Sequence, residues 1–245
     1  MEKGKVAKAM RCIGSQRSSI LDVTDQVLND LISKHPEAQG IQHDSLYQGP
    51  LKQKPVEEVI FECLDAEAIH KAAKKVDGAA GPSGADSELW QRLICSKQFK
   101  QKPAALCAEI SMTARKLNTQ SINPDFLRAY VAGRLLPLDK KPGCRPIGIG
   151  EVIRRIIGSA TVSFLKPEII EKTAPLQTCS GISGGVEASI HAMRKMWDDP
   201  ETEGILLIDA SNAFNAMNRK VALKNLDYTC PELAVYLRNV YNGNA

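Results

Sequence analysis

The sequence lacks closely spaced cysteines and long apolar runs, and these absences exclude several classes of protein. Its seven cysteines all stand apart, and the smallest gap, from Cys95 to Cys107, is 12 residues. Zinc knuckles and redox motifs place two cysteines only a few residues apart, so no thiolate metal site is expected. The odd cysteine count and the absence of an apolar signal segment after Met1 predict an intracellular protein with free thiols, in the nucleus or the cytoplasm. No run of about 18 apolar residues is present, so we expect no transmembrane helix and no membrane partner.

Net positive charge is also small, but it is concentrated in one segment. The chain carries a net charge of +4 over 245 residues, which by itself argues only weakly for a polyanionic partner. Residues 134–155 hold six basic residues against two acidic ones, an excess that equals the net charge of the whole chain. The rest of the sequence is therefore nearly neutral.

The composition is that of a chain that folds around a core. Hydrophobic residues make up 43% of the sequence, which is enough for one large domain or two smaller ones. We expect an N-terminal helix and irregular arm over residues 1–56, because an apolar helical stripe is followed there by a segment rich in proline and glycine. Residues 57–203 are expected to form a layer of helices that includes one β-hairpin. Residues 204–245 begin with an apolar run and continue as helices.

Apolar residues at helical spacing predict most of the helices in the middle region. Asn123 and Pro124 supply an N-cap followed by a proline in the first turn of one of them. Trp90 and Trp197 both lie on such apolar stripes, so both are expected in the core. Residues 77–84, DGAAGPSG, contain three glycines and are expected to form a permissive loop between two helices.

Two short apolar segments enclose the basic cluster and predict a β-hairpin. LLPL (135–138) and PIGI (146–149) flank DKKPGCR (139–145), whose proline and glycine favour a turn. A further strand is expected at residues 205–208, since GILLI (204–208) is a continuous apolar run, typical of a strand buried on both faces. The predicted fold class is therefore α+β, mostly helical with a small incomplete sheet.

Asp209 follows this predicted strand directly. An aspartate at the C-terminal end of a buried strand is held rigidly where solvent begins, which suits a ligand for a divalent cation. On position alone, an ordinary strand-end or helix-capping aspartate is the more common interpretation. The residues around Asp209 favour the metal-binding role.

Two segments carry a resemblance to reverse transcriptases. LLIDASNAFN (206–215) resembles the first catalytic motif of that family: a hydrophobic strand, a metal-binding aspartate and an aromatic residue five positions later. LPLDKKPGCRPI (136–147) resembles the fingers motifs, in which a lysine precedes Arg-Pro-Ile by a few residues. AGPSG (80–84) and QTCSG (177–181) resemble two further motifs more loosely. The resemblance covers about residues 61–226 and is nearest to retrotransposon enzymes.

The resemblance implies RNA-directed DNA synthesis by a right-hand polymerase fold, of which residues 57–203 would be the fingers and residues 204–245 the start of the palm. The implied partners are an RNA template, a DNA primer and a deoxynucleoside triphosphate. The implied cofactor is Mg²⁺, which supports nucleotidyl transfer by the two-metal mechanism. The element type and the oligomeric state stay open.

In the first catalytic motif, the resemblance assigns roles to consecutive residues. Asp209 would supply a bridging carboxylate to the magnesium ions, and the carbonyl of Ala210 would add a ligand. The backbone amides around Asn212 and Ala213 would face the triphosphate. Phe214 would be the steric gate that excludes a ribose 2′-hydroxyl, the alternative being plain core packing.

In the hairpin, Arg145 would clamp the triphosphate with its planar guanidinium, assisted by Lys140 or Lys141 as a point charge. The register between the two lysines is ambiguous. The alternative for all three is a solvated hairpin tip. Arg154 and Arg155 are expected mainly on the polar face of their helix, with template phosphates as a second possibility.

The sequence after Asp209 lacks the motifs that the family's chemistry needs next. Of the 36 residues after it, Asp227 is the sole aspartate. A single carboxylate does not hold two magnesium ions at their usual separation of about 3.5–4 Å. We therefore expect a truncated reverse transcriptase that is inactive alone. The alternative is a noncatalytic nucleic-acid-binding or scaffold remnant of such an element.

Overall fold

The computed structural model of the chain describes residues 19–37, 40–49, 56–96, 101–140, 143–173, 177–179 and 181–241. The helices, in chain order, are α2 (Asp25–Ser33), α3 (Ala66–Lys75), α4 (Ser87–Cys95), α5 (Lys102–Thr119), α6 (Pro124–Val131), α7 (Val152–Phe164), α8 (Lys166–Thr173), α9 (Gly185–Trp197), α10 (Ala213–Ala216), α11 (Arg219–Thr229) and α12 (Pro231–Tyr241). Strands β1 (Gly133–Asp139) and β2 (Cys144–Gly150) pair in antiparallel fashion, and short 3-10 helices occupy His43–Ser45 and Glu58–Cys63.

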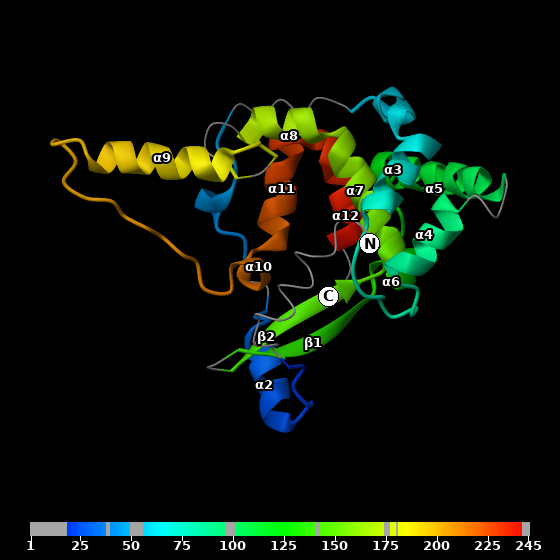
Figure 1. Ribbon diagram of the computed structural model, residues 1–245, viewed down its shortest axis with the longest axis horizontal. Coiled ribbons are helices and arrows are strands. Elements are labelled where there is room, and N and C mark those ends of the chain that lie inside the picture. The colour runs from blue at the N-terminus through cyan, green and yellow to red at the C-terminus, as the bar shows by residue number, and fades with distance from the viewer. Residues whose placement is uncertain are drawn as a thin grey trace, which may run out of the picture.

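Most of the helices form one body, and the hairpin and α9 extend from it (Figure 1). Helices α3, α4, α5, α6, α7 and α12 gather on the right of the view, with α8 above and α11 beside them. The β1–β2 hairpin runs below this body, and α2 packs against β2. Helix α9 projects to the left, away from the body.

The hydrophobic core lies where α3, α5, α7 and α12 meet. Helix α3 contributes a stripe at helical spacing, and α7 faces it with a second stripe, so that two amphipathic surfaces close against each other. Residues from α12 complete the same core, although α12 is more than 60 positions after α7 in the chain. The largest fully buried side chains are Phe61, Leu64, Ile69, Ile94, Leu117, Ile156, Ile157 and Leu165.

Helix starts follow the capping rules that the sequence predicts. The carboxylate of Asp65 accepts a hydrogen bond from the backbone amide of Ala68 at 2.9 Å and so begins α3. Asn123 caps α6 through its side chain, with Pro124 in the first turn. A side-chain cap of this kind stabilises a helix by about 1 kcal/mol, because it satisfies an amide that has no partner inside the helix.

The hairpin gains a third, very short backbone partner from the N-terminal segment. The amide of Leu21 donates to the carbonyl of Pro137, and the amide of Asp139 donates to the carbonyl of Ser19, both at 2.9 Å. Proline at position 137 has no N–H of its own, so its carbonyl is its single backbone hydrogen-bonding group. The edge of β1 is therefore covered by residues that lead directly into α2.

Glu151 connects the hairpin, α7 and the glycine-rich loop. It lies between the end of β2 and the start of α7, and its side chain is 6% exposed. Its carboxylate accepts hydrogen bonds from the amide and the hydroxyl of Ser83, at 2.7 and 2.6 Å. A Cβ on Gly81 would lie 2.9 Å from the backbone of Glu151, so only glycine allows the loop to approach this closely.

Arg155, one turn further along α7, holds the other end of the same loop. Its guanidinium donates to the carbonyl of Asp77 at 2.7 Å and also to the carbonyl of Ala79. Residues 77–84 form no helix or strand, so their polar backbone groups need partners from elsewhere. Glu151, just before α7, and Arg155, within it, provide those partners at the two ends of the loop.

Helix α12 docks onto the body through two polar side chains. Asn239 is buried, and its side-chain oxygen accepts from the amide of Ile122 at 3.0 Å. The hydroxyl of Tyr236 lies 3.3 Å from the hydroxyl of Tyr130. It also fills the space left by Gly158 on α7, where a Cβ would lie 2.9 Å from the phenol oxygen. These contacts place α12 in the same core as the helices before it.

The structure confirms the coarse expectations from the sequence. The chain is α+β, mostly helical, with a small antiparallel sheet. The hairpin lies where the basic cluster predicted it, and residues 77–84 form the expected loop. None of the described helices is both long enough and apolar enough to cross a membrane.

Two expectations are wrong. Residues 205–208 form no strand, and Leu206 and Ile208 are each 84% exposed. A strand needs the backbone groups of a neighbour, and no described strand lies beside this segment. Trp197 is 63% exposed at the end of α9, whereas Trp90 packs against the core as expected. In both failures the apolar pattern was present, but it did not reveal which surface would cover it.

We predict that Glu151→Ala lowers the free energy of unfolding by about 1.5–3 kcal/mol, because the amide and hydroxyl of Ser83 would lose a charged acceptor in a buried site. The measurement is urea denaturation followed by circular dichroism. Glu109→Ala, on the exposed face of α5, is the matched control and should change stability by less than about 0.5 kcal/mol. Equal effects of the two substitutions would show that Glu151 does not hold the loop.

We also predict that the folded state becomes less stable above about pH 10. Burial raises the pKa of Tyr130, and burial likewise raises the pKa of Tyr236. The folded state therefore keeps both phenols neutral. Their contribution to the free energy of unfolding is fully present below the ordinary tyrosine pKa of about 10. It declines above that pH, because the same tyrosines ionise in the unfolded chain. Urea midpoints between pH 8 and pH 11 should show a steeper fall for the natural sequence than for Tyr130→Phe/Tyr236→Phe. Identical slopes would contradict the prediction.

Candidate functional site

The tip of the hairpin presents the predicted cations to solvent. Arg145 pairs with Leu138 in the register of the two strands, one position from the turn, and its side chain is exposed. Lys140 is exposed at the start of the turn, which is closed by a hydrogen bond from its amide to the carbonyl of Gly143 at 3.2 Å. Neither side chain forms an ion pair with another described residue. Lys141 lies outside the described residues.

The segment that resembles the first catalytic motif is also exposed. Asp209 and Ala210 belong to an irregular stretch, and Ala213 and Phe214 begin the four-residue helix α10. Phe214 is 92% exposed, so core packing, the alternative for this residue, is wrong. The aromatic ring is free to contact a ligand.

Asn212 has the unusual backbone conformation of this segment. Its φ of 53° and ψ of 32° place it in the left-handed region, and it is the non-glycine residue with positive φ among those described. Asparagine tolerates this conformation better than most residues. Its side chain is held at both ends, because its oxygen accepts from Nδ2 of Asn215 at 3.1 Å and its own Nδ2 donates to the carbonyl of Lys34 at 2.7 Å.

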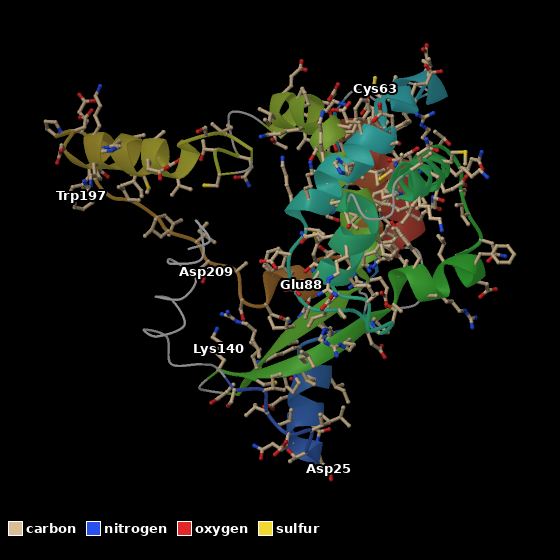
Figure 2. The ribbon with its side chains drawn as sticks, turned by 45° about the vertical axis from the view of Figure 1, so that its right-hand side comes forward. Asp25, Cys63, Glu88, Lys140, Trp197 and Asp209 are labelled. Atoms are coloured by element: carbon tan, nitrogen blue, oxygen red, sulfur yellow. The ribbon has the colours of Figure 1, made fainter. Side chains whose placement is uncertain are left out.

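Lys34 links the motif segment to the hairpin. While its carbonyl accepts from Asn212, its Nζ donates to the carbonyl of Cys144 at the start of β2. Lys34 is the C-terminal cap of α2, and α2 packs against β2. One residue of the N-terminal region thus joins two motif segments that are 68 positions apart. Figure 2 shows Asp209 and Lys140 on the same side of the molecule, and in Figure 1 α10 lies above the hairpin.

The described residues do not form a magnesium site. Within the parts of the chain that the structure describes, no three His, Cys, Asp or Glu side chains come together in a way that could hold a metal ion. Asp209 is exposed and belongs to no such group of three among the described residues. These residues therefore do not fit the two-metal arrangement, and we derive no chemical step through magnesium.

Arg154 and Arg155 act within the protein instead of facing solvent along the helix. Arg154 donates to the carbonyl of Val131 at 3.0 Å, and Arg155 holds the glycine-rich loop through the carbonyl of Asp77. The sequence alone suggested neither role. For Lys34, which connects the motifs, the sequence offered only a weak signal: a basic residue just after a helix, where free carbonyls and the helix dipole attract cations.

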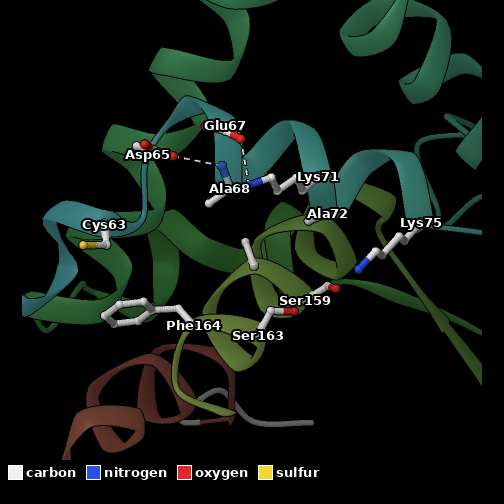
Figure 3. A pocket seen from close by; sticks show the side chains of 11 residues that line it. Cys63, Asp65, Glu67, Ala68, Lys71, Ala72, Lys75, Ser159, Ser163 and Phe164 are labelled. Carbon is white, nitrogen blue, oxygen red and sulfur yellow. Dashed lines mark hydrogen bonds and ion pairs between the residues drawn. The ribbon is translucent and has the colours of Figure 1, made fainter. Parts of the chain in front are cut away.

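A cavity of about 330 Å³ lies between α3 and α7 (Figure 3). Ala72 and Ala160 are among the small side chains that line it, and Lys75 reaches in from one end. Lys71 on its wall is paired with Glu67 at 2.7 Å. None of the residues proposed for the triphosphate or the metal contributes to its lining.

We predict that Lys34→Met loosens the hairpin without unfolding the body. Losing a hydrogen bond from a charged donor removes about 1.5–3 kcal/mol of local stabilisation, so amide exchange in residues 133–150 should accelerate about tenfold or more. Exchange in residues 209–217 should change less, because Asn212 bonds to the backbone carbonyl of residue 34, which the substitution keeps. Hydrogen exchange with mass spectrometry measures this, and Lys116→Met on the exposed face of α5 is the control. Asn212→Gly keeps the backbone conformation and should loosen 209–217 alone. Unchanged exchange in the hairpin of Lys34→Met would contradict the link.

Comparison with protein families, with curated proteins and with solved structures finds no match to this chain.

Proposed function

We propose that this chain is the fingers and the start of the palm of a retrotransposon-type reverse transcriptase, and that its own residues bind nucleic acid and triphosphate. The observation that carries the proposal is the double contact of Lys34. It brings the hairpin that resembles the fingers motifs next to the segment that resembles the first catalytic motif. Two resemblances found far apart in the sequence gain weight when the fold joins them.

The hairpin tip has the chemistry of a phosphate site. Arg145, on β2 near the tip, and Lys140, just after β1, are exposed cations and make no ion pair with another described residue. A planar guanidinium binds two phosphate oxygens at once, whereas an ammonium acts as a point charge that adapts to the position of the ligand. In this proposal the pair, with Lys141, holds the triphosphate of an incoming deoxynucleotide or the backbone of a template strand.

The segment that resembles the first catalytic motif supplies the other groups that the proposal needs. Phe214 offers an exposed ring where the proposal needs a steric gate against a ribose 2′-hydroxyl. Asp209 supplies one carboxylate, and the turn at Asn212 fixes the amides that precede α10. Nucleotidyl transfer needs further carboxylates, which these described residues do not bring together. We therefore propose that the 245-residue chain binds its ligands but does not extend a primer by itself.

The second candidate is a noncatalytic nucleic-acid-binding or scaffold remnant of such an element. The absence of a carboxylate cluster among the described residues favours it. Both candidates predict binding through the hairpin, and they differ in the gene sequence expected downstream of Ala245. An open frame that encodes a paired-aspartate motif there would support the polymerase. A stop codon retained in related elements would support the remnant.

We predict that replacing Lys140, Lys141 and Arg145 together with glutamine lowers the affinity for a primer–template duplex and flattens its dependence on salt. Each lost phosphate contact reduces the slope of log K against log salt by about 0.7–0.9, so three contacts reduce it by roughly 2–3. Fluorescence anisotropy between 50 and 200 mM salt measures this range well. Lys74, Lys75 and Lys116, exposed on the helical body, form a matched control set whose replacement should leave the slope nearly unchanged.

Asp209→Asn tests, in the same assay, whether the hairpin binds phosphate independently of metal coordination by Asp209. Binding without magnesium should be almost unchanged, because the proposed work of Asp209 is metal coordination. Primer extension should be absent in both the natural chain and the variant. Extension by the natural chain, abolished in Asp209→Asn, would overturn the claim that the chain is inactive alone. Equal salt slopes for the hairpin variant and its control would overturn the binding site.

A further inference from the structure

Helix α9 is exposed on all sides, including its apolar one. It projects from the body in both Figure 1 and Figure 2, which labels Trp197 at its far end. Its apolar side chains are between 40% and 63% exposed, and they form a continuous stripe: Val186, Ile190, Met193 and Trp197. A helix of 13 residues is marginal in water when nothing packs against it. Some surface is therefore needed to cover this stripe.

The spacing of the stripe is that of a helix that pairs with another helix. Successive members are four, three and four residues apart, which is the alternation of core positions in a coiled coil. The outer face carries His191 and Lys195, which suits exposure to water. Glu187 and Arg194 flank the stripe on the same side, one near each end of the helix.

We propose that α9 pairs with α9 of a second copy of this chain, in antiparallel orientation. A two-fold axis between Ile190 and Met193 would place these two residues opposite each other across the interface. It would also place Val186 opposite Trp197, so that a small side chain meets a large one in each outer layer. The apolar stripe would then be closed along its whole length.

Charge complementarity supports this occupant and this orientation. In an antiparallel pair, flanking residues on the same side of the seam face their own counterparts, so Glu187 of one copy faces Arg194 of the other, twice. In a parallel pair each flanking residue would instead face the opposite flank of the partner five positions away, so Arg194 would face Ser189 and no opposite charges would meet. The side chains at positions 187 and 194 are exposed in the single chain, so both are available.

The base of α9 is fixed in a way that leaves the seam open. A Cβ on Gly185 would overlap the carbonyl oxygen of Thr178, so the first turn packs directly on the preceding segment. The hydroxyl of Ser189 lies 2.7 Å from that of Thr178, on the side of the helix opposite to Glu187 across the stripe. This anchor orients α9 away from the body and blocks none of the four apolar residues.

The test is a charge exchange followed by sedimentation velocity over a concentration series. Glu187→Arg and Arg194→Glu should each weaken self-association about tenfold, since each puts like charges face to face twice. The double variant should restore it, because opposite charges meet again. An equimolar mixture of the two single variants should form a mixed dimer more readily than either forms its own.

Lys195→Glu, on the outer face of α9, is the matched control and should leave self-association unchanged. Ile190→Asp, at the centre of the seam, should yield a monomer, and circular dichroism would verify that the body stays folded. A protein that is monomeric at every concentration would overturn the proposal and would point to cover from the exposed residues 205–208 of the same chain. Single variants without effect, or a double variant without rescue, would overturn the antiparallel pairing. None of these outcomes depends on the proposed polymerase function.

Discussion

The hydrogen bonds between the start of α7 and the glycine-rich loop set the geometry on which the rest of the structure depends. Glu151 and Arg155, one helical turn apart, supply hydrogen-bond partners to opposite ends of a loop that has no regular structure. Unpaired backbone groups are costly to bury, so such a loop can pack closely only where side chains replace the missing backbone partners. Because the loop connects α3 to α4, the same contacts fix how α3 lies on α7.

The contacts between the start of α7 and the glycine-rich loop also set the direction of the hairpin. Strand β2 ends at Gly150, and Glu151 is the next residue, so the body end of the hairpin is attached where the loop is attached. At the other end, Lys34 connects the carbonyl of Cys144 to the side chain of Asn212. The exposed cations of the tip are therefore held on a strand pair that is fixed at both ends. A charged group on a rigid support loses less entropy when it binds than the same group on a mobile loop.

The features that could be predicted from the sequence are those encoded locally. Apolar spacing predicted the helices, and Asn123 followed by Pro124 predicted the start of α6. The proline and glycine between two apolar segments predicted the hairpin. The contacts that place these elements were not predictable, because they join distant positions: Glu151 with Ser83, and Lys34 with Cys144, are 68 and 110 residues apart. The same limit explains the errors at 205–208 and Trp197, where a real apolar pattern predicted burial without identifying a neighbour.

The position of α12 in the core also constrains how the protein is made. Asn239 bonds to Ile122 and Tyr236 to Tyr130 across separations of 117 and 106 residues. A ribosome releases the chain from its N-terminus, at about 5–20 residues per second. For several seconds of each round of translation, α5, α6 and α7 are already available while the helix that closes their shared groove has not yet emerged. During that interval the apolar surface that α12 covers is open to chaperones and to neighbouring nascent chains, and this part of the core forms only once residues 231–241 have emerged.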